Sequence, residues 1–160
     1  MAKGNKIVVS PHPKGVEIEG TINGALKPGT VVQIDVSEGI DTGTNRMQWE
    51  AYAPGTDGDQ RLIAVLLPDR HQGKLATDAY VSGDQCFVYV PVAGEQLNML
   101  YLDIAGTGDD HAFGDVMMVD TSTGKLIATT GTPESEPFTC LEAATDPTAD
   151  SLLHSLYTGY

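Results

Sequence analysis

Residues 85–104 read QCFVYVPV, then AGE, then QLNMLYLDI. The two outer runs are rich in Val, Tyr, Phe and Leu, which favour the pleated and half-buried surface of a β-strand. The Ala93-Gly94-Glu95 segment between them is a turn, since glycine adopts conformations that other residues avoid. This stretch therefore predicts two strands, Gln85–Val92 and Gln96–Ile104.

The same pattern of short β-favouring runs continues in both directions along the chain. The 18 glycines and 9 prolines punctuate these runs at regular spacing, which predicts an all-β fold, a compact antiparallel β-barrel or β-sandwich. The further predicted strands are Lys6–Ser10, Val16–Ile22, Thr30–Val36, Arg46–Tyr52, Arg61–Leu67, Asp78–Val81, Asp115–Asp120, Lys125–Thr130 and Phe138–Ala143.

Three segments give more detailed expectations. Arg61–Leu67 is nearly continuous apolar, which is typical of a strand buried on both faces. Asp115–Asp120 and Lys125–Thr130 flank a polar turn and predict a β-hairpin. The tail Asp150–Tyr157 has Leu152, Leu153 and Leu156 behind a capping aspartate, which predicts a short C-terminal helix.

The 160 residues fit one domain. We expect residues 1–15 to form an extended N-terminal arm, because Pro11 and Pro13 keep it out of helical conformations. The alternative for this segment is terminal disorder. Residues 16–160 form a single β domain on this prediction.

The net charge of −13 opposes binding to phosphate backbones, so nucleic acid is not an expected partner. No apolar run approaches the roughly 20 residues that cross a bilayer, so we expect no membrane association. The apolar run Ile7-Val8-Val9 is too short for a signal peptide. We therefore expect a protein that is made in a cytoplasm.

The sequence predicts no catalytic residue, no cofactor and no metal site. The best candidate is the loop of residues 106–115, where Asp109, Asp110, His111 and Asp115 gather. Their spacing is not that of a calcium loop, and local hydrogen bonds that hold turns are the simpler use of these carboxylates. Whether the loop binds a cation stays open.

Other side chains also favour a structural role. Cys86 and Cys140 lie inside apolar runs, as expected of buried free thiols, although their redox state stays open. The four histidines share no local motif, and no Gly-x-Ser-x-Gly elbow is present. Trp49 and Tyr52 differ in parity along their strand and so face opposite sides, which argues against an aromatic sugar-binding platform and favours a core role for Trp49.

Three passages resemble the capsid decoration, or cement, proteins of tailed phages. These passages are Ala25–Val32, Tyr80–Pro91, and Gly114–Ile127 leading to Phe138–Ala143, each a tight turn that feeds a strand.

The resemblance implies a viral structural protein of the virion. It would be made in the host cytoplasm and bind the outer capsid surface as a homotrimer. Its partner would be the major capsid protein, whose neighbouring subunits it would clamp and stabilise. The arm of residues 1–15 would then reach across to a neighbour. The resemblance implies no enzyme activity and no cofactor. The alternatives are another β-rich interaction or adhesin module, such as a tail, fibre or carbohydrate-binding component, and an enzyme built on a β-barrel.

Overall fold

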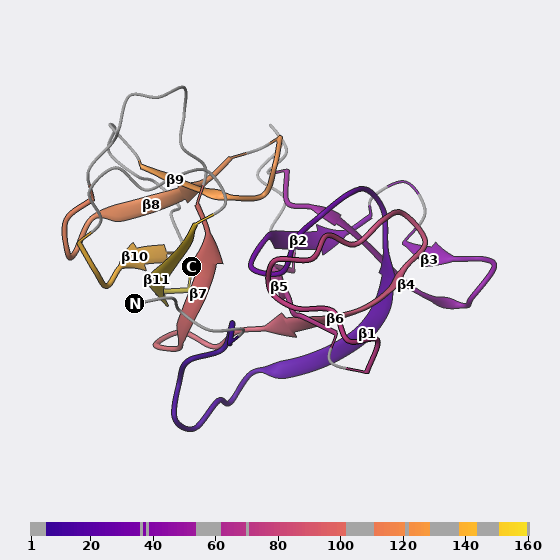
Figure 1. Cartoon of the computed structure of the whole chain (residues 1–160), viewed down its shortest axis with the longest axis horizontal. Coiled ribbons are helices and arrows are strands. Elements are labelled where there is room, and N and C mark those ends of the chain that lie inside the picture. The colour runs from indigo at the N-terminus through magenta and orange to yellow at the C-terminus, as the bar shows by residue number, and fades with distance from the viewer. Residues whose placement is uncertain are drawn as a thin grey trace.

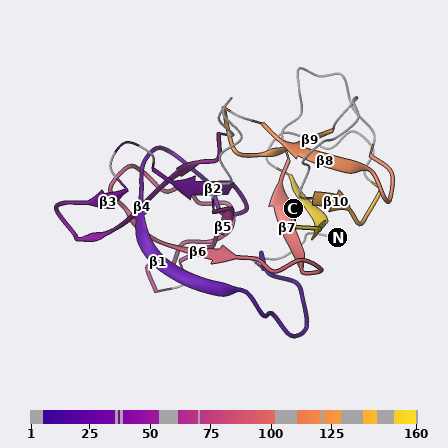
Figure 2. The same ribbon diagram turned by 180° about the vertical axis from the view of Figure 1, so that it is seen from behind.

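The computed structural model describes residues 6–35, 37, 39–53, 62–69, 71–101, 111–120, 122–128, 138–143 and 151–159. In these residues the regular secondary structure is entirely β, with eleven strands, and no helix here could cross a membrane. The strands form two lobes, which Figure 1 shows side by side and Figure 2 shows from behind. The all-β expectation agrees with this architecture.

The first lobe is a closed barrel. Its sheet has the order β1-β6-β5-β2-β4-β3, and β1 also pairs with β4, which closes five strands into a ring. The β1–β4 pair is parallel, whereas the other pairs of this sheet are antiparallel, so the predicted fully antiparallel barrel needs this correction. The strands are β1 (Val16–Ile22), β2 (Val31–Ile34), β3 (Ile40–Asp41), β4 (Arg46–Ala51), β5 (Ala64–Leu66) and β6 (Gln85–Val90).

The second lobe is an antiparallel five-stranded sheet in the order β7-β11-β10-β8-β9. The β8–β9 hairpin agrees with the hairpin predicted from the sequence. An isolated bridge from Tyr101 to Leu126 brings the end of β7 towards β9 and curves the sheet. The strands are β7 (Gln96–Leu100), β8 (Val116–Val119), β9 (Leu126–Ala128), β10 (Phe138–Cys140) and β11 (Leu152–Tyr157).

The two strands of residues 85–100 do not pair with each other. β6 belongs to the barrel and β7 to the second sheet, so the turn at Ala93-Gly94-Glu95 carries the chain from one lobe to the other. Main-chain hydrogen bonds tie the lobes together: the Leu100 amide donates to the Gly29 carbonyl at 2.9 Å, and the Val31 amide donates to the Gly124 carbonyl at 2.8 Å.

Alternation along the barrel strands builds two cores. Val32, Leu66 and Val88 point into the barrel, around Trp49. Their neighbours Val31, Val65 and Tyr89 point outward and pack against the second sheet. β5 is therefore buried on both faces, as the apolar run Arg61–Leu67 predicted, because each face meets a different core.

The predicted C-terminal helix over Asp150–Tyr157 is wrong. Residues 152–157 form β11, which lies between β7 and β10. Isolated helices shorter than about 12 residues are marginal, whereas β11 gains main-chain pairing on both sides. β3 (Ile40–Asp41) is not among the strands predicted from the sequence. The proposed division at residue 15 stays a prediction.

Candidate interaction surface

The first described residues of the arm pair with the edge of the second sheet. Val8 bridges Leu97 in antiparallel register. The Asn98 amide donates to the Ile7 carbonyl at 2.7 Å, and the Val9 amide donates to the Gln96 carbonyl at 2.9 Å. Because β7 is the edge strand of its sheet, the arm becomes the outermost segment there. Residues 6–10 thus lie against their own chain.

The Glu95 carboxylate holds the arm where it turns towards β1. Its Oε1 accepts hydrogen bonds from the Lys14 amide, from the Gly15 amide at 3.2 Å and from the Tyr89 hydroxyl at 2.7 Å. Its Oε2 accepts one from the Val92 amide at 2.8 Å. Burial alone raises the pKa of Glu95, but these four donors outweigh it and hold the pKa below its ordinary value.

Gly15 is required for this close approach. A Cβ built there would lie 2.2 Å from the Val90 carbonyl oxygen and 2.5 Å from the Tyr89 ring. The Gly15 amide also donates to the Tyr89 hydroxyl at 2.8 Å. Burial raises the pKa of Tyr89 to about 12, and the bond to Glu95 adds to the effect.

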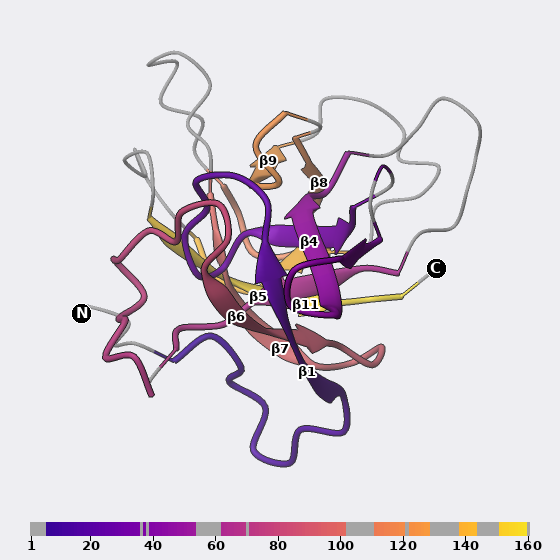
Figure 3. The same ribbon diagram turned by 90° about the vertical axis from the view of Figure 1, so that its right-hand side faces the viewer.

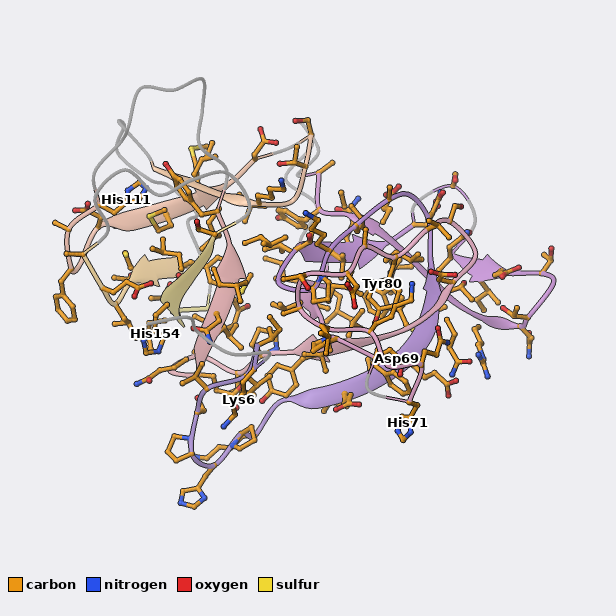
Figure 4. All side chains as sticks on the ribbon, viewed as in Figure 1. Lys6, Asp69, His71, Tyr80, His111 and His154 are labelled. Carbon is orange, nitrogen blue, oxygen red and sulfur yellow. The ribbon has the colours of Figure 1, made fainter. Side chains whose placement is uncertain are left out.

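A groove of about 390 Å³ lies between the arm and the barrel. Ile7, Val8 and two prolines of the arm line one side, and Leu67, Pro68 and Phe87 line the other. Four polar residues also line the groove: Lys6, Ser10, Glu17 and His71. Figure 4 shows Lys6 between the two lobes and His71 on the barrel side, and His71 packs beside Phe87 with ring centroids 6.1 Å apart.

The loop that was the best candidate for a cation site supports a structural role in its described part. Asp115 accepts a 2.7 Å hydrogen bond from the Ala112 amide and so holds a turn. The ring of His111 packs edge-on against Tyr101 at 4.5 Å. Asp109 and Asp110 lie outside the described residues. Among the residues that the structure describes, no group of three or more potential ligands could hold a metal ion.

The described histidines do not converge on one site. His12 is exposed on the arm, and Figure 4 shows His71 on the barrel while His111 and His154 lie in the second lobe. His154 lies in β11 and not in a helix, where its amide donates to the Glu142 carboxylate at 2.6 Å.

Both cysteines are buried free thiols, as expected. Burial, with a smaller contribution from the charge of Asp69, raises the pKa of the Cys86 thiol to about 12. The Cys140 thiol donates to the Glu142 carbonyl at 2.9 Å.

The aromatic residues of β4 and its end do not form a sugar-binding platform. Trp49 is buried in the barrel core, and Tyr52 is buried between the lobes. The expected opposite orientation and the core role of Trp49 are therefore confirmed.

Phe113 on a tight turn and the Ile40–Met47 pair on a hairpin are exposed apolar features. Phe113 is 73% exposed at a turn in which the Asp115 amide donates to the Ala112 carbonyl and Gly114 has a φ of 94°. Ile40 and Met47 face each other across the β3–β4 pair and are also exposed. This hairpin extends from the barrel at the end remote from the second sheet (Figure 1).

Sequence reasoning missed the role of Glu95, which it placed in an ordinary turn. The available signal was a glutamate between two strongly apolar strands, where a carboxylate is buried only with several donors around it. The donors come from residues 14 and 15, about 80 positions earlier in the chain, and no local pattern connects them to Glu95.

Comparison with solved structures finds a protein that shares this fold. No family model matches the sequence, and no curated protein matches it. A solved structure described as the N base of the head fibre gp8.5 in bacteriophage phi29 matches with a TM-score of 0.54. The match covers 90% of this chain and 94% of that chain at 11% sequence identity. The two chains therefore share a fold.

Proposed function

We propose that the chain is a structural protein of a tailed-phage virion that binds the outer surface of the capsid. The observation that carries this proposal is the shared fold with a head-fibre base across 90% of the chain. The sequence resemblance to decoration proteins points to the same part of a virion. On this proposal the chain is made in the host cytoplasm and resides on the capsid.

The finer proposal is a homotrimer that clamps neighbouring subunits of the major capsid protein. Three linked copies would have to release all of their contacts together, which raises the avidity without any new contact. Phe113 on its hydrogen-bonded turn and the Ile40–Met47 pair supply apolar anchors of the kind that carry binding energy in interfaces. The charge of −13 suits a basic partner surface and speeds encounter with it.

We further propose that the chain acts by binding and not by catalysis. Two observations on the described residues support this: both thiols are buried, and the histidines lie apart (Figure 4). General acid–base or nucleophilic chemistry needs such groups within hydrogen-bond reach of one another.

The test is co-sedimentation of the purified chain with phage capsids that lack it, together with light scattering of the free chain. Saturable binding supports the proposal, and a mass near three times the 16.9 kDa chain supports the trimer. If the chain stays in the supernatant at all concentrations that saturate a known decoration protein, the proposal fails.

A second candidate is the base of a head fibre, because the matched structure is described as such a base. The two candidates differ in their effect on the capsid. A clamp should raise the temperature at which capsids release DNA, whereas a fibre base should bind at discrete sites and leave that temperature unchanged.

A further inference from the structure

The arm leaves one main-chain edge open. The Ile7 carbonyl accepts a hydrogen bond from β7, and the Val9 amide donates one to β7. Because successive groups of an extended strand point to opposite sides, the amide and carbonyl of Val8 point away from β7. Within the described part of the chain these two groups have no hydrogen-bond partner. Such an edge is a template for another extended segment.

The open edge borders the groove, which has apolar side chains on both sides. Val8 lines it on the arm side, and Leu67, Pro68 and Phe87 line it on the barrel side. All four side chains are half-buried, so each still exposes apolar surface to an incoming group. A segment that paired with Val8 would therefore bury its side chains against Leu67 and Phe87. Main-chain pairing supplies affinity in this mode of recognition, and the side-chain contacts supply specificity.

The charges at the groove indicate which charge an incoming extended segment should carry. Glu17 and Lys6 both line the groove and are exposed. Glu17 has no ion pair among the described residues. The whole chain adds a field of net charge −13. The field of the whole chain attracts an approaching basic segment and repels an acidic one. Within the groove a basic side chain would pair with Glu17 and stay away from Lys6.

We propose that this groove is a docking site for an extended segment of a partner protein, which adds a strand to the free edge of Val8, places apolar side chains against Leu67 and Phe87, and carries a basic residue for Glu17. The site goes beyond the proposed function, since it depends on the arm and the barrel alone and does not require the partner to be a capsid.

The test uses the full-length chain, labelled with ¹⁵N, and one defined probe. The probe is a hexapeptide with the sequence Lys-Val-Thr-Val-Thr-Lys, acetylated at its N-terminus and amidated at its C-terminus. We expect amide shifts at Val8, Leu67 and Phe87 with a Kd on the order of 1 mM, as for a short and unoptimised segment. Shifts confined to other surfaces, or no shift at several times that concentration, would overturn the proposal.

Two N-methylated probes test the edge directly. One is methylated on both valine nitrogens and the other on both threonine nitrogens. Alternate amides of a strand point to opposite sides, so one of the two probes should bind roughly tenfold more weakly, which corresponds to one lost hydrogen bond, while the other retains binding. If both bind as well as the parent peptide, or both fail equally, the segment does not pair with an edge.

The charge contribution is tested with matched variants. Glu17→Gln should weaken binding of the lysine-bearing probe about two- to five-fold, the size of an exposed ion pair. Asp78→Asn removes the same charge at an exposed position outside the groove lining and should leave binding unchanged. Equal effects of both variants would show that only the net charge matters and would remove Glu17 from the site. Capsid sedimentation is a separate measurement, so a failure of either proposal can be recognised by itself.

Discussion

The hydroxyl of Tyr89 donates a 2.7 Å hydrogen bond to the carboxylate of Glu95, and this buried bond joins β6, the last strand of the barrel, to the residue before β7. The same hydroxyl oxygen accepts a hydrogen bond of 2.8 Å from the Gly15 amide. The arm, the barrel and the second sheet therefore meet at one polar contact. Figure 3 shows the arm passing below the barrel strands β1 and β6.

A double-mutant cycle on this contact should show strong coupling. Tyr89→Phe and Glu95→Gln should each lower the free energy of unfolding by roughly 1–3 kcal/mol, because each leaves buried hydrogen-bonding groups without a partner. The double variant should lose less than the sum of the two by about 0.5–3 kcal/mol. Urea unfolding of the four proteins measures this coupling, and additive losses would contradict it.

The stability of the chain should fall in acid through Glu95. The folded-state pKa of Glu95 lies below its ordinary value of 4.5, so its contribution is fully present above pH 4.5 and disappears as the pH falls through the folded-state pKa. Asp84 and Asp120 also have lowered pKa values and contribute to the same decline. The difference in unfolding free energy between the unaltered chain and Glu95→Gln isolates Glu95 and should shrink below pH 4.5. A constant difference would refute this assignment.

Gly20→Ala should destabilise the barrel. A Cβ at Gly20 would lie 2.4 Å from Nε1 of Trp49 and 2.5 Å from the Met47 carbonyl, so the indole must move within a closed core. Overpacking of this kind costs roughly 1–3 kcal/mol. Thermal unfolding followed by tryptophan fluorescence reports both the loss and the displaced ring. An unchanged emission maximum together with unchanged stability would show that the core accommodates the methyl group.

Cys86 should be inert to alkylation in the folded chain. Burial raises its thiol pKa to about 12, and the reactive species is the thiolate. Iodoacetamide at pH 8 should therefore modify Cys86 only as fast as the chain opens. Unfolding the chain in urea should make the modification rapid. Mass spectrometry of peptides from a time course measures the modification site by site. Rapid labelling without urea would show that the barrel opens readily.

Phe113→Ser should weaken capsid binding without changing the fold. An exposed side chain on a turn contributes little to stability, so the free energy of unfolding should change by less than about 0.5 kcal/mol. As an aromatic anchor it should contribute roughly 2 kcal/mol or more to binding. Val81→Ser is the control, since Val81 is also exposed, at 59%, in another part of the chain. If both variants co-sediment with capsids alike, Phe113 is not an anchor.

Local patterns predicted most of the strands. Val16–Ile22 coincides with β1, and the apolar run around Val65 was rightly expected to be buried on both faces. The segment from Leu152 to Tyr157 was misassigned because its leucine spacing suits a short helix equally well, and only the neighbours β7 and β10 decide between the two. Secondary-structure propensity is weak against such tertiary pairing.

Features that depend on distant residues could not be predicted. The parallel pair β1–β4 closes the barrel between segments that have no common local signal. The anchoring of the arm by Glu95 and the groove beside Val8 depend in the same way on segments that are far apart in the chain. The sequence did predict that the loop around Asp115 would hold a turn, because an aspartate that bonds a nearby amide needs no distant partner.

The contacts of Glu95 also describe the route of the chain. The chain enters the barrel at Gly15 and leaves it just before Glu95, and the two points are hydrogen-bonded to each other. The segments before and after the barrel both lie in the second lobe. In topological terms the barrel is a closed excursion of the chain between two segments of the second lobe. Its loops and strands can therefore change in length without changing the order of the strands in the sheet that holds both ends.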